Sequence, residues 1–409
     1  MDSKSLKTIH TRCCIAGGGP AGIMLGYLLA RSGIDVIVLE KWPDFFRDFR
    51  GDTIHPSTMQ VLHELGILED FLKLPHSKAR QIRWHIGDEE VTIADFSYLK
   101  ARCPYIAFIP QWDFLNFIAE QAKRYPSFHL HMETETTDVI EENGCVVGVR
   151  AKSSTGEIEI RAELIVGADG RHSTVREKAG FVVNTFGVPI DVLWFRLSRS
   201  GVDREQPFAY VDKGKMVVPI DRGDYWQCAR PIRKGDFEKI KADGLTTFQN
   251  DLAELVPSFA AVVHEIDSWD KVKLLSVTVE RLKQWARTGV LMIGDAAHAM
   301  SPMGGVGINL AIQDAVAAGN ILVPAFKQGV PTVDDLRGVQ RRREFPTRLT
   351  QRLQMVIQDY VITRVLASRV SIALPLPLRL FNWLPSLRFI PAYFVGIGFR
   401  PEHVRVREI

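Results

Sequence analysis

The stretch RCCIAGGGPAGIMLGYLLARSGIDVIVLEK, residues 12–41, contains the pattern that decides the fold. An apolar run at 13–16 predicts a short strand, and a second apolar run at 35–39 predicts another strand after an intervening helix. Gly17-x-Gly19-x-x-Gly22 stands between the first strand and the helix. This is the glycine pattern of a βαβ unit that binds a dinucleotide, and the fold class it predicts is α/β.

Each of these residue types has a physical reason to stand where it does. Gly17 permits the tight turn, Gly19 lets a pyrophosphate approach the backbone, and Gly22 lets the helix pack closely on the strand. The phosphates are expected to face the helix N-terminus, where unpaired N–H groups favour negative charge. Glu40, at the end of the second strand, is placed to accept hydrogen bonds from ribose hydroxyls. The pattern alone does not distinguish NAD from FAD.

Two further glycine-containing stretches follow, far apart in the sequence. In AELIVGADGRHSTVREKAG, residues 162–180, an apolar strand ends in Asp169 and Gly170. Taken alone, this stretch is equally consistent with a strand that ends in a simple turn. In GDAAHAMSPMGGVGINLAIQDA, residues 294–315, a buried strand is followed by Asp295, and a helix begins after Pro302.

The start of that last helix is unusually bare, with glycine at positions 304, 305 and 307. Glycine in or near a helix costs roughly 1 kcal/mol against alanine. The glycines leave the N–H groups at the start of the helix uncovered, which suits the flat, electron-rich edge of a ligand. His298, inside the same stretch, is expected to brace the loop.

These three motifs, in this order, resemble those of the group A flavoprotein monooxygenases. These enzymes are FAD-dependent hydroxylases related to para-hydroxybenzoate hydroxylase, to the ubiquinone-pathway hydroxylases and to the tetracycline-inactivating monooxygenases. The resemblance covers roughly residues 10–350. It implies a Rossmann-like FAD-binding domain of the GR2 type, an inserted antiparallel-sheet substrate domain and a C-terminal helical segment. The expected ranges are 1–180 and 281–350 for the two parts of the FAD-binding domain, 181–280 for the substrate domain and 351–409 for the helical segment.

The resemblance also assigns FAD as the cofactor and NADPH or NADH as the co-substrate. By this resemblance Asp295 holds a ribityl hydroxyl, and Arg50 and Gln111 contact the FAD phosphate or ribityl region. Residues 307–309 approach the pyrimidine edge of the isoalloxazine, where the helix N-terminus stabilises negative charge. The complete set of expected cofactor-binding residues is Gly17, Gly19, Pro20, Ala21, Gly22, Glu40, Lys41, Arg50, Gln111, Asp169, Gly170, Gly294, Asp295, Pro302, Gly305, Gly307, Ile308 and Asn309. Asp169 and Gly170 belong to a motif implicated in binding both FAD and the pyridine nucleotide.

A different pattern fills the region between about 181 and 279. Short β-branched and aromatic runs, DVLWFRLS, PFAYVD, KMVVPID and YWQCARPI, are separated by turn residues and predict an antiparallel sheet. In the family such a sheet roofs a substrate cavity over the flavin. The large side chains that are candidates to line this cavity are Trp194, Phe208, Tyr210 and Trp226. Because side chains alternate along a strand, half of them should face the other way.

The implied reaction is hydroxylation of an aromatic or polycyclic small molecule through a flavin C4a-hydroperoxide formed from O2. The acid–base candidates are His55 and Tyr210, although a purely structural hydrogen bond is the favoured interpretation of each. No W-x-W-x-I-P stretch occurs, which argues against a flavin halogenase. Two alternatives stay open: an FAD-dependent reductase or dehydrogenase without oxygen insertion, and a non-catalytic FAD-binding protein.

Composition bears on the compartment of the protein and on metal, nucleic-acid and membrane binding. The five cysteines form no C-x-x-C pair and show no metal spacing, which favours a cytoplasmic protein without a metal site. No nucleic-acid-binding module is recognisable. Residues 337–409 hold thirteen arginines, no lysine and four acids, but no apolar run long enough to span a membrane. This region either packs over the other domains or makes a peripheral membrane contact or a greasy substrate entrance. The substrate and the oligomeric state stay open.

Overall fold

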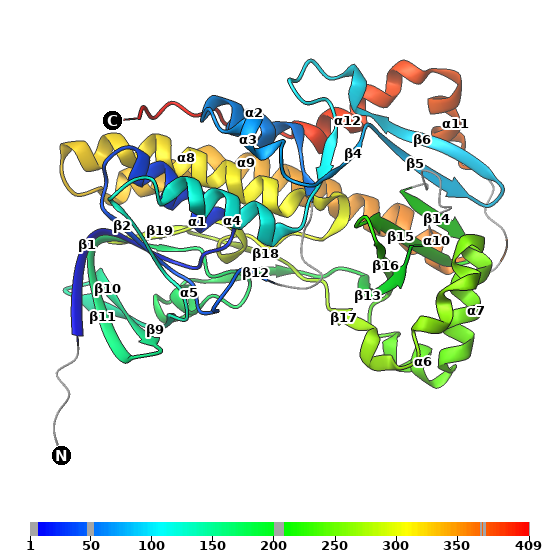
Figure 1. Ribbon diagram of the computed structural model, residues 1–409, viewed down its shortest axis with the longest axis horizontal. Helices are drawn as coiled ribbons and strands as arrows, with labels where there is room; N and C mark the ends of the chain where they lie inside the picture. Colours follow the sequence, from blue (N-terminus) through cyan, green and yellow to red (C-terminus); the bar gives the residue numbers. More distant parts are fainter. Residues whose placement is uncertain (1–6, 47–52, 200–207, 369, 371–373, 409) are drawn as a thin grey trace.

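The computed structural model of the protein describes residues 7–46, 53–199, 208–368, 370 and 374–408. Two large sheets lie at opposite ends of an elongated molecule (Figure 1). Helices α8 (Val306–Gln328) and α9 (Val333–Ile357) run along the molecule from the first sheet toward the second (Figure 1). The expected α/β architecture with a second sheet and C-terminal helices is confirmed.

Among the described residues the first sheet has eight strands, with β19-β20-β11-β1-β2-β8 in one row and β10 and β9 continuing from β11. Their bounds are β1 Lys7–Ala16, β2 Val36–Leu39, β8 Phe128–His131, β9 Glu135–Glu142, β10 Cys145–Ser153, β11 Gly156–Gly167, β19 Ala286–Arg287 and β20 Val290–Met292. Strands β8, β2, β1, β11 and β20 are parallel, whereas β9, β10 and β19 pair in the antiparallel sense.

The centre of the first sheet is covered on both faces, because its strands are apolar throughout. All four residues of β2 are buried, as are the last four of β1. Helices α1 (Pro20–Arg31), α4 (Gln111–Ala122) and α8 cover one face, where Ile15, Leu28 and Ile312 belong to one core cluster. On the other face lie β9, β10 and α5 (Thr174–Lys178), around a second cluster that includes Trp285 (Figure 1).

One helix among the described residues, Met303–Gln328, is long and apolar enough to cross a membrane. However, 72% of its most apolar window is buried inside the protein. Its small residues permit close helix packing, since a Cβ on Gly319 would lie 3.1 Å from Leu28 on α1. This helix is therefore part of the core, against the first sheet.

Within the described residues the second sheet has seven strands in the order β17-β13-β16-β15-β14-β5-β6. Their bounds are β5 Gln81–Ile86, β6 Glu89–Asp95, β13 Ile190–Ser198, β14 Ala209–Asp212, β15 Lys215–Asp221, β16 Tyr225–Arg233 and β17 Lys273–Leu275. Neighbours are antiparallel except β14 and β5, which are parallel. Two of the strands come from residues 81–95, so the second sheet also draws on the range predicted for the first domain.

The faces of the second sheet are occupied by different partners. Helices α6 (Phe237–Ala242) and α7 (Leu245–Leu255) cover one face, where Tyr210 and Trp226 pack with Phe248. Trp194 and Phe208 pack in clusters on the other face. The four large side chains are therefore divided between the two faces of the sheet, as expected.

Shorter elements join the two sheets. The strands are β3 Thr53–Ile54, β4 Ser77–Ala79, β7 Ile106–Phe108, β12 Val183–Phe186 and β18 Val279–Leu282, and the helices are α2 Pro56–Glu64 and α3 Leu68–Phe71. Strand β7 pairs with β3 and β4. Strand β12 pairs with β18, where the chain leaves and re-enters the first half of the molecule.

The chain ends in short helices followed by an extended segment. The helices are the π-helical turn η7 Gln358–Ile362, α10 Thr363–Ala367, α11 Leu376–Trp383, the turn η8 Pro385–Arg388 and α12 Phe389–Gly396. Residues 399–408, here named the C-terminal strap, run back over α8 toward α1 (Figure 1). Asn320 donates a hydrogen bond to the carbonyl oxygen of His403 at 2.8 Å, and Tyr125 donates one to Glu408 at 2.6 Å.

Candidate functional site

Parallel pairing brings the three glycine-containing motifs to one edge of the first sheet. Ala16, at the end of β1, pairs with Leu39 on β2 and with Gly167 on β11. Gly167 in turn pairs with Met292 on β20. Since parallel strands end at the same edge, the residues that follow these positions lie side by side.

The motifs also touch one another through positions where only hydrogen fits. Gly17 has a φ of +104°, and a Cβ there would lie 2.4 Å from the carbonyl oxygen of Ala168. A Cβ on Gly22 would lie 1.9 Å from the carbonyl oxygen of Gly17. A Cβ on Gly294 would lie 3.0 Å from the Cβ of Ala21. These contacts hold the three motifs together as one structural unit.

Gly19 is bare for a different reason. A Cβ on Gly19 would meet no atom within 4 Å, so the space in front of it is open. It is the N-cap of α1, Pro20 is the first residue of the helix, and no side chain caps the helix. The uncapped N–H groups and the helix dipole therefore face an open space that fits a pyrophosphate.

Glu40 is held at the same edge by two backbone N–H groups. Its Oε2 accepts a hydrogen bond from Gly18 at 3.1 Å, and its Oε1 accepts one from Trp42 at 3.2 Å. A carboxylate oxygen has a second lone pair, so the oriented side chain retains acceptor capacity for a ribose hydroxyl. Lys41 lies on the surface, with Nζ 3.9 Å from Glu135.

The start of α8 uses its glycines in two ways. Gly304 and Gly305 adopt φ values of +75° and +61°, in the left-handed region that favours glycine. A Cβ on Gly305 would lie 2.1 Å from Oγ1 of Thr53, so this residue is bare because β3 packs on it. A Cβ on Gly307 would meet nothing within 4 Å. The open backbone at Gly307, on an uncapped helix start, fits the edge of a flavin ring.

Asn309 has its side chain directed away from that opening. Its Nδ2 donates to the carbonyl oxygen of Thr53 at 3.0 Å. Its Oδ1 accepts hydrogen bonds from the backbone N of His55 at 2.9 Å and from Oγ1 of Thr58 at 2.7 Å. Ile308 is buried in the core. At positions 308 and 309 only the backbone is therefore available to the flavin, because both side chains have structural partners.

Asp295 lies at the carboxyl edge with about a third of its side chain exposed. Nε of Arg171 donates to its Oδ2 at 3.2 Å, and Nη2 of Arg171 donates to the carbonyl oxygen of Met300 at 3.0 Å. Arg171 thus links the second motif to the third. Arg171 was not among the expected site residues.

Asp169 is turned inward, toward the start of α5. It accepts hydrogen bonds from Oγ of Ser173 and from the backbone N of Val175, the latter at 3.1 Å. Burial raises the pKa of Asp169, although these hydrogen bonds oppose the shift. Gly170 follows with a φ of +83°. The aspartate therefore fixes the turn against which Gly17 packs.

The loop that carries Pro302 is held from outside by glutamines on one face of α9 and η7. Nε2 of Gln351 donates to the carbonyl oxygen of Ala299 at 3.0 Å. Nε2 of Gln354 donates to the carbonyl oxygens of Ser301 at 3.0 Å and Met303 at 2.8 Å. Gln358 donates to the hydroxyl of Ser301. Their spacing of three and four residues was the one sequence signal for this buried polar face.

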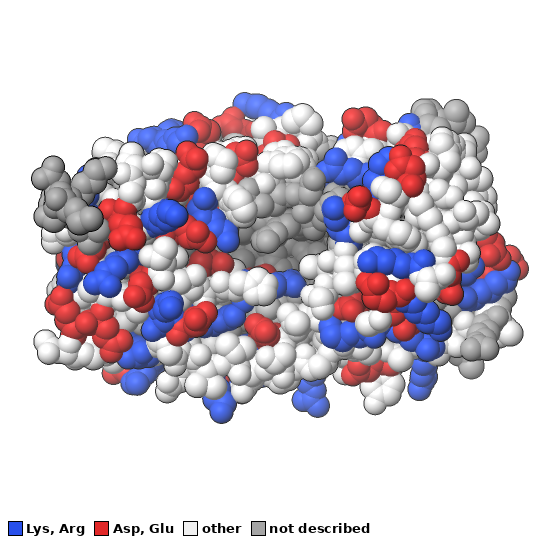
Figure 2. All heavy atoms as spheres, turned by 90° about the horizontal axis from the view of Figure 1, so that it is seen from below, with Lys and Arg blue, Asp and Glu red and all other residues white. Residues whose placement is uncertain are grey.

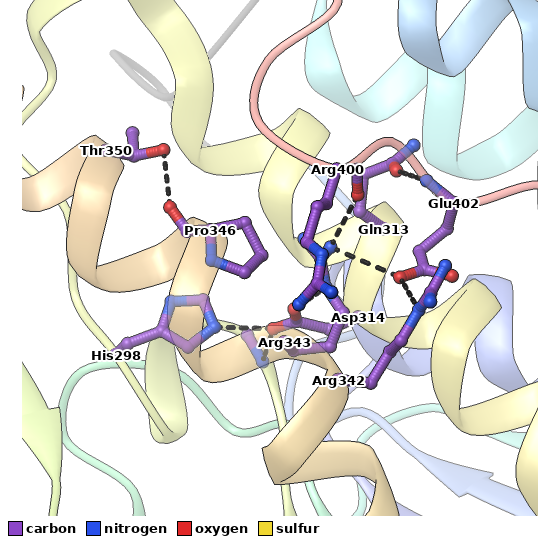
Figure 3. Close-up of polar contacts among 10 residues, drawn as sticks. His298, Gln313, Asp314, Arg342, Arg343, Pro346, Thr350, Arg400 and Glu402 are labelled. Atoms are coloured by element: carbon purple, nitrogen blue, oxygen red, sulfur yellow. Dashed lines mark hydrogen bonds and ion pairs between the residues drawn. The ribbon is translucent and has the colours of Figure 1, made fainter.

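A buried carboxylate, Asp314 on α8, joins the third motif to α9 (Figure 3). Its Oδ2 accepts a hydrogen bond from the backbone N of Gly294 at 3.1 Å and lies 2.5 Å from Nε2 of His298. Its Oδ1 accepts one from Nε of Arg343 at 2.9 Å. Burial alone would raise the pKa of Asp314, but His298 and Arg343 hold that pKa below its usual value. The expected bracing role of His298 is confirmed by this contact.

The same network continues into the C-terminal strap through Glu402 (Figure 3). Oε1 of Glu402 lies 2.7 Å from Nε of Arg342 and 3.5 Å from Nη1 of Arg343. The backbone N of Glu402 donates to the side-chain oxygen of Gln313. Charged side chains from three distant segments, α8, α9 and the strap, therefore meet beneath the third motif together with His298, and no local sequence pattern indicates it.

The two acid–base candidates occupy different environments. His55 is fully buried, its Nδ1 lies 2.7 Å from the carbonyl oxygen of Val395, and its Nε2 has no hydrogen-bond partner among the described residues. Burial lowers the pKa of His55 to about 4, so its ring is neutral near neutral pH. Tyr210 packs with Phe248 beneath α7, on the face of the second sheet opposite Phe208. The acid–base role of Tyr210 stays a prediction, and its side chain lies on the face of the second sheet opposite the cluster that contains Met303.

Two expected flavin contacts remain. Gln111 is the first residue of α4 and is half-buried. Arg50 lies outside the described residues.

An apolar wall lies next to the start of α8. Met303, directly before the glycines, packs in a cluster with the half-buried side chains of Trp84 and Val218 on the second sheet and of Phe208 directly before β14. Figure 2 shows a deep hollow on one face of the molecule, between the end that carries the first sheet and the end that carries the second. Cofactor-type backbone and an apolar sheet face thus meet at Met303.

Comparison with known proteins agrees with this geometry. The chain matches the family described as FAD binding domain over residues 10–352. It is 30% identical to 6-methylpretetramide 4-monooxygenase of Streptomyces rimosus over 407 residues, which is 97% of this chain and 94% of that protein. It is 25% identical to para-nitrophenol 4-monooxygenase of Pseudomonas sp. (strain WBC-3), over 81% of this chain and 82% of that protein.

Solved structures show the same fold. The p-nitrophenol 4-monooxygenase PnpA from Pseudomonas putida DLL-E4 aligns with a TM-score of 0.74 at 19% identity, over 96% of this chain and 98% of that one. OxyS anhydrotetracycline hydroxylase from Streptomyces rimosus aligns with a TM-score of 0.73 at 22% identity, over 95% of this chain and 76% of that one. The glycine cradle fits FAD and the family match covers most of the chain, so the protein belongs to this family of FAD-dependent aromatic monooxygenases.

Proposed function

We propose that the protein hydroxylates a polycyclic aromatic small molecule, with NADH or NADPH as the electron donor and O2 as the oxygen donor. The observation that carries the proposal is the junction at Met303. The backbone is open at Gly307, four residues after Met303. The side chain of Met303 packs with the apolar face of the second sheet. A flat aromatic substrate and a flat cofactor ring meet at such a junction.

The chain's own groups bind and orient the cofactor. The uncapped N-terminus of α1 at Gly19 takes the pyrophosphate, Glu40 takes the ribose, and Asp295 takes a ribityl hydroxyl. The N-terminus of α8 at Gly307 stabilises negative charge on the ring edge that faces it. When bound, FAD supplies the redox centre that accepts a hydride from NAD(P)H and activates O2.

The apolar wall excludes water and orients the substrate ring. Trp84, Phe208 and Val218 are half-buried in one cluster, so their exposed parts offer apolar surface rather than hydrogen bonds. Water exclusion matters because it suppresses the unproductive release of reduced oxygen as peroxide. A wall of this composition selects substrates by shape and apolar area more than by charge.

The comparisons support a substrate with several rings. The match with 6-methylpretetramide 4-monooxygenase extends over nearly the full length of both proteins. It therefore includes the second sheet and the C-terminal helices, which form the apolar wall. Single-ring phenols are the alternative substrate class, as in para-nitrophenol 4-monooxygenase.

The experiment is NADH and NADPH oxidation by flavin-loaded protein with polycyclic aromatics and single-ring phenols. Peroxide and oxygenated product are measured together, and labelled O2 traces the inserted atom. The proposal expects at least one polycyclic compound to accelerate oxidation and to gain one oxygen atom from O2. Acceleration with peroxide alone from every compound, or product oxygen from water, contradicts it. Flavin-poor Gly19→Val protein is the control for non-enzymatic oxidation.

A further inference from the structure

The α11–η8–α12 segment, residues 376–396, forms a C-terminal hairpin with an unusually apolar outer surface. Trp383 at the end of α11 is 72% exposed, and the next residue, Leu384, is 52% exposed. The large apolar side chains exposed along this hairpin are Leu380, Trp383, Leu384, Phe389, Ile390, Tyr393 and Phe394. Exposure is greatest at the tip, where α11 gives way to η8.

The hairpin is also apolar on its inner side, and that side is already occupied. Leu378 and Phe381 pack in the cluster that contains Met303. Ala392 is fully buried, and Gly396 lies so close to Phe96 that a Cβ there would be 3.1 Å from its ring. The exposed side chains therefore form a second apolar face, on which Phe389, Tyr393 and Phe394 contact one another and Phe399 but remain more than a third exposed. A helix that is apolar on all sides is typical of a buried or membrane-contacting element.

The positive charge of this region indicates which kind of surface binds the exposed apolar face. Between Asp359 and Glu402 the sequence contains no acidic residue and five arginines. Two of these arginines lie on the hairpin itself, where each bonds a nearby backbone carbonyl: Arg379 that of Leu374 and Arg388 that of Phe381. A surface that joins arginine to exposed aromatic and aliphatic side chains complements anionic headgroups above an acyl layer.

A second copy of the chain fits this face less well. The hairpin itself carries two arginines and no acid, and Nη2 of Arg379 also lies 3.8 Å from Oε1 of Glu89 on β6. A two-fold contact would bring these arginine-bearing segments against each other, and their like charges would oppose the association. The two helices of the hairpin have eight residues each, which is too short to span a bilayer. Their arrangement suits a segment that lies at the interface, with the Trp383 tip entering it.

We propose that the C-terminal hairpin docks the protein on an anionic lipid surface through Trp383, Leu384 and their exposed apolar neighbours. The apolar path continues inward, since Leu378 and Phe381 share a cluster with Met303 at the junction described above. This second point rests on the proposed function, whereas the docking does not. A lipophilic aromatic substrate concentrated in the lipid would then enter beside the apolar wall.

The test is co-sedimentation of the full-length, flavin-loaded protein with vesicles. Phosphatidylglycerol-containing vesicles are compared with pure phosphatidylcholine vesicles, at low and at high salt. We expect binding to the anionic vesicles alone, and weaker binding at high salt because counterions screen the arginines. Leu384→Ser should weaken the binding about tenfold, since it removes a large apolar side chain from the contact. Val330→Ser, at a 59% exposed position on a different loop, should leave it unchanged.

Each other result overturns the docking. Absence of sedimentation, equal binding to both kinds of vesicle, or equal effects of Leu384→Ser and Val330→Ser would each do so. If the wild type self-associates with rising concentration and Leu384→Ser does not, the face belongs to a second copy of the chain. If Leu384→Ser changes neither vesicle binding nor self-association, the face belongs to a protein partner. FAD content, measured in every variant, reports that the fold is intact. Docking without catalysis would sink the proposed function and leave this inference standing.

Discussion

Nε2 of His298 lies 2.5 Å from Oδ2 of Asp314, and both side chains are at most 1% exposed. The same carboxylate accepts hydrogen bonds from Arg343 and from the backbone of Gly294. One buried negative charge therefore orders the turn before Asp295. The cofactor edge depends on a residue that lies behind it.

Replacing Asp314 with asparagine should lower the free energy of unfolding. The change leaves the buried guanidinium of Arg343 without its closest negative partner, and breaking a buried ion pair costs about 3 to 5 kcal/mol. Chemical unfolding gives the free energy, and flavin absorbance per protein gives the FAD retained. Asp334→Asn, whose side chain is 78% exposed on the first turn of α9, is the matched control. Equal stability of the two variants would show that the network is dispensable.

The pH dependence of stability should carry a signature of His55. Burial lowers its pKa to about 4, whereas the unfolded chain binds this proton at about 6.5. The unfolded state therefore binds more protons between these two values, and stability falls as the pH drops through that window. The contribution lost between about pH 7 and about pH 5 is about 2 kcal/mol.

The measurement for His55 is urea unfolding of wild type and His55→Gln at both pH values. The variant has no group that titrates in this window at position 55, so its stability should fall less on acidification. An identical pH dependence of the two proteins would mean that His55 is protonated in the folded state as readily as in the unfolded state.

Gly19 and Gly22 should respond differently to a side chain. A Cβ on Gly22 would lie 1.9 Å from the carbonyl oxygen of Gly17, so Gly22→Ala should lose both stability and FAD. Gly19 has an extended backbone that any residue adopts and faces open space, so Gly19→Val should fold normally and bind little FAD. Thermal unfolding of the apoprotein separates the two effects. Full FAD retention in Gly19→Val would place the pyrophosphate elsewhere.

Gln354→Leu should loosen the loop that carries Pro302. The change leaves the carbonyl oxygens of Ser301 and Met303 buried without that donor, at a cost of about 2 to 4 kcal/mol. Release of FAD, followed by flavin fluorescence, should be faster. Arg352→Ala changes an exposed residue nearby on α9 and should affect neither property. If both variants release FAD at the same rate, the glutamine face does not position the loop.

Sequence patterns predict the parts of the site that are local in the chain. The contact between Gly17 and Gly22 and the bond from Gly18 to Glu40 all lie inside one βαβ unit, whose spacing is fixed by its geometry. The fold class and the family followed from three such local patterns. Asn309 shows where this approach ends, because its side chain bonds Thr53 across more than 250 positions.

The second sheet shows the same limit. Alternation along β14 would put Phe208 on the same face as Tyr210, two residues later. Phe208 stands instead at a bend before the strand and packs with the cluster of Ala209 and Val211. The direction of a side chain at a strand end depends on the backbone before it, which propensity does not specify. The buried charges around Asp314 are likewise set by tertiary packing.

The C-terminal strap has a consequence for how the protein is made. Glu402 joins the charge network beneath the third motif. Glu408 bonds Arg31 at the end of α1 and Tyr125 just after α4. Domains usually fold in the order of synthesis, N-terminal part first. Here the contacts that complete the nucleotide-binding half include residues from the C-terminal strap, so a polypeptide that has not yet reached residue 408 lacks them.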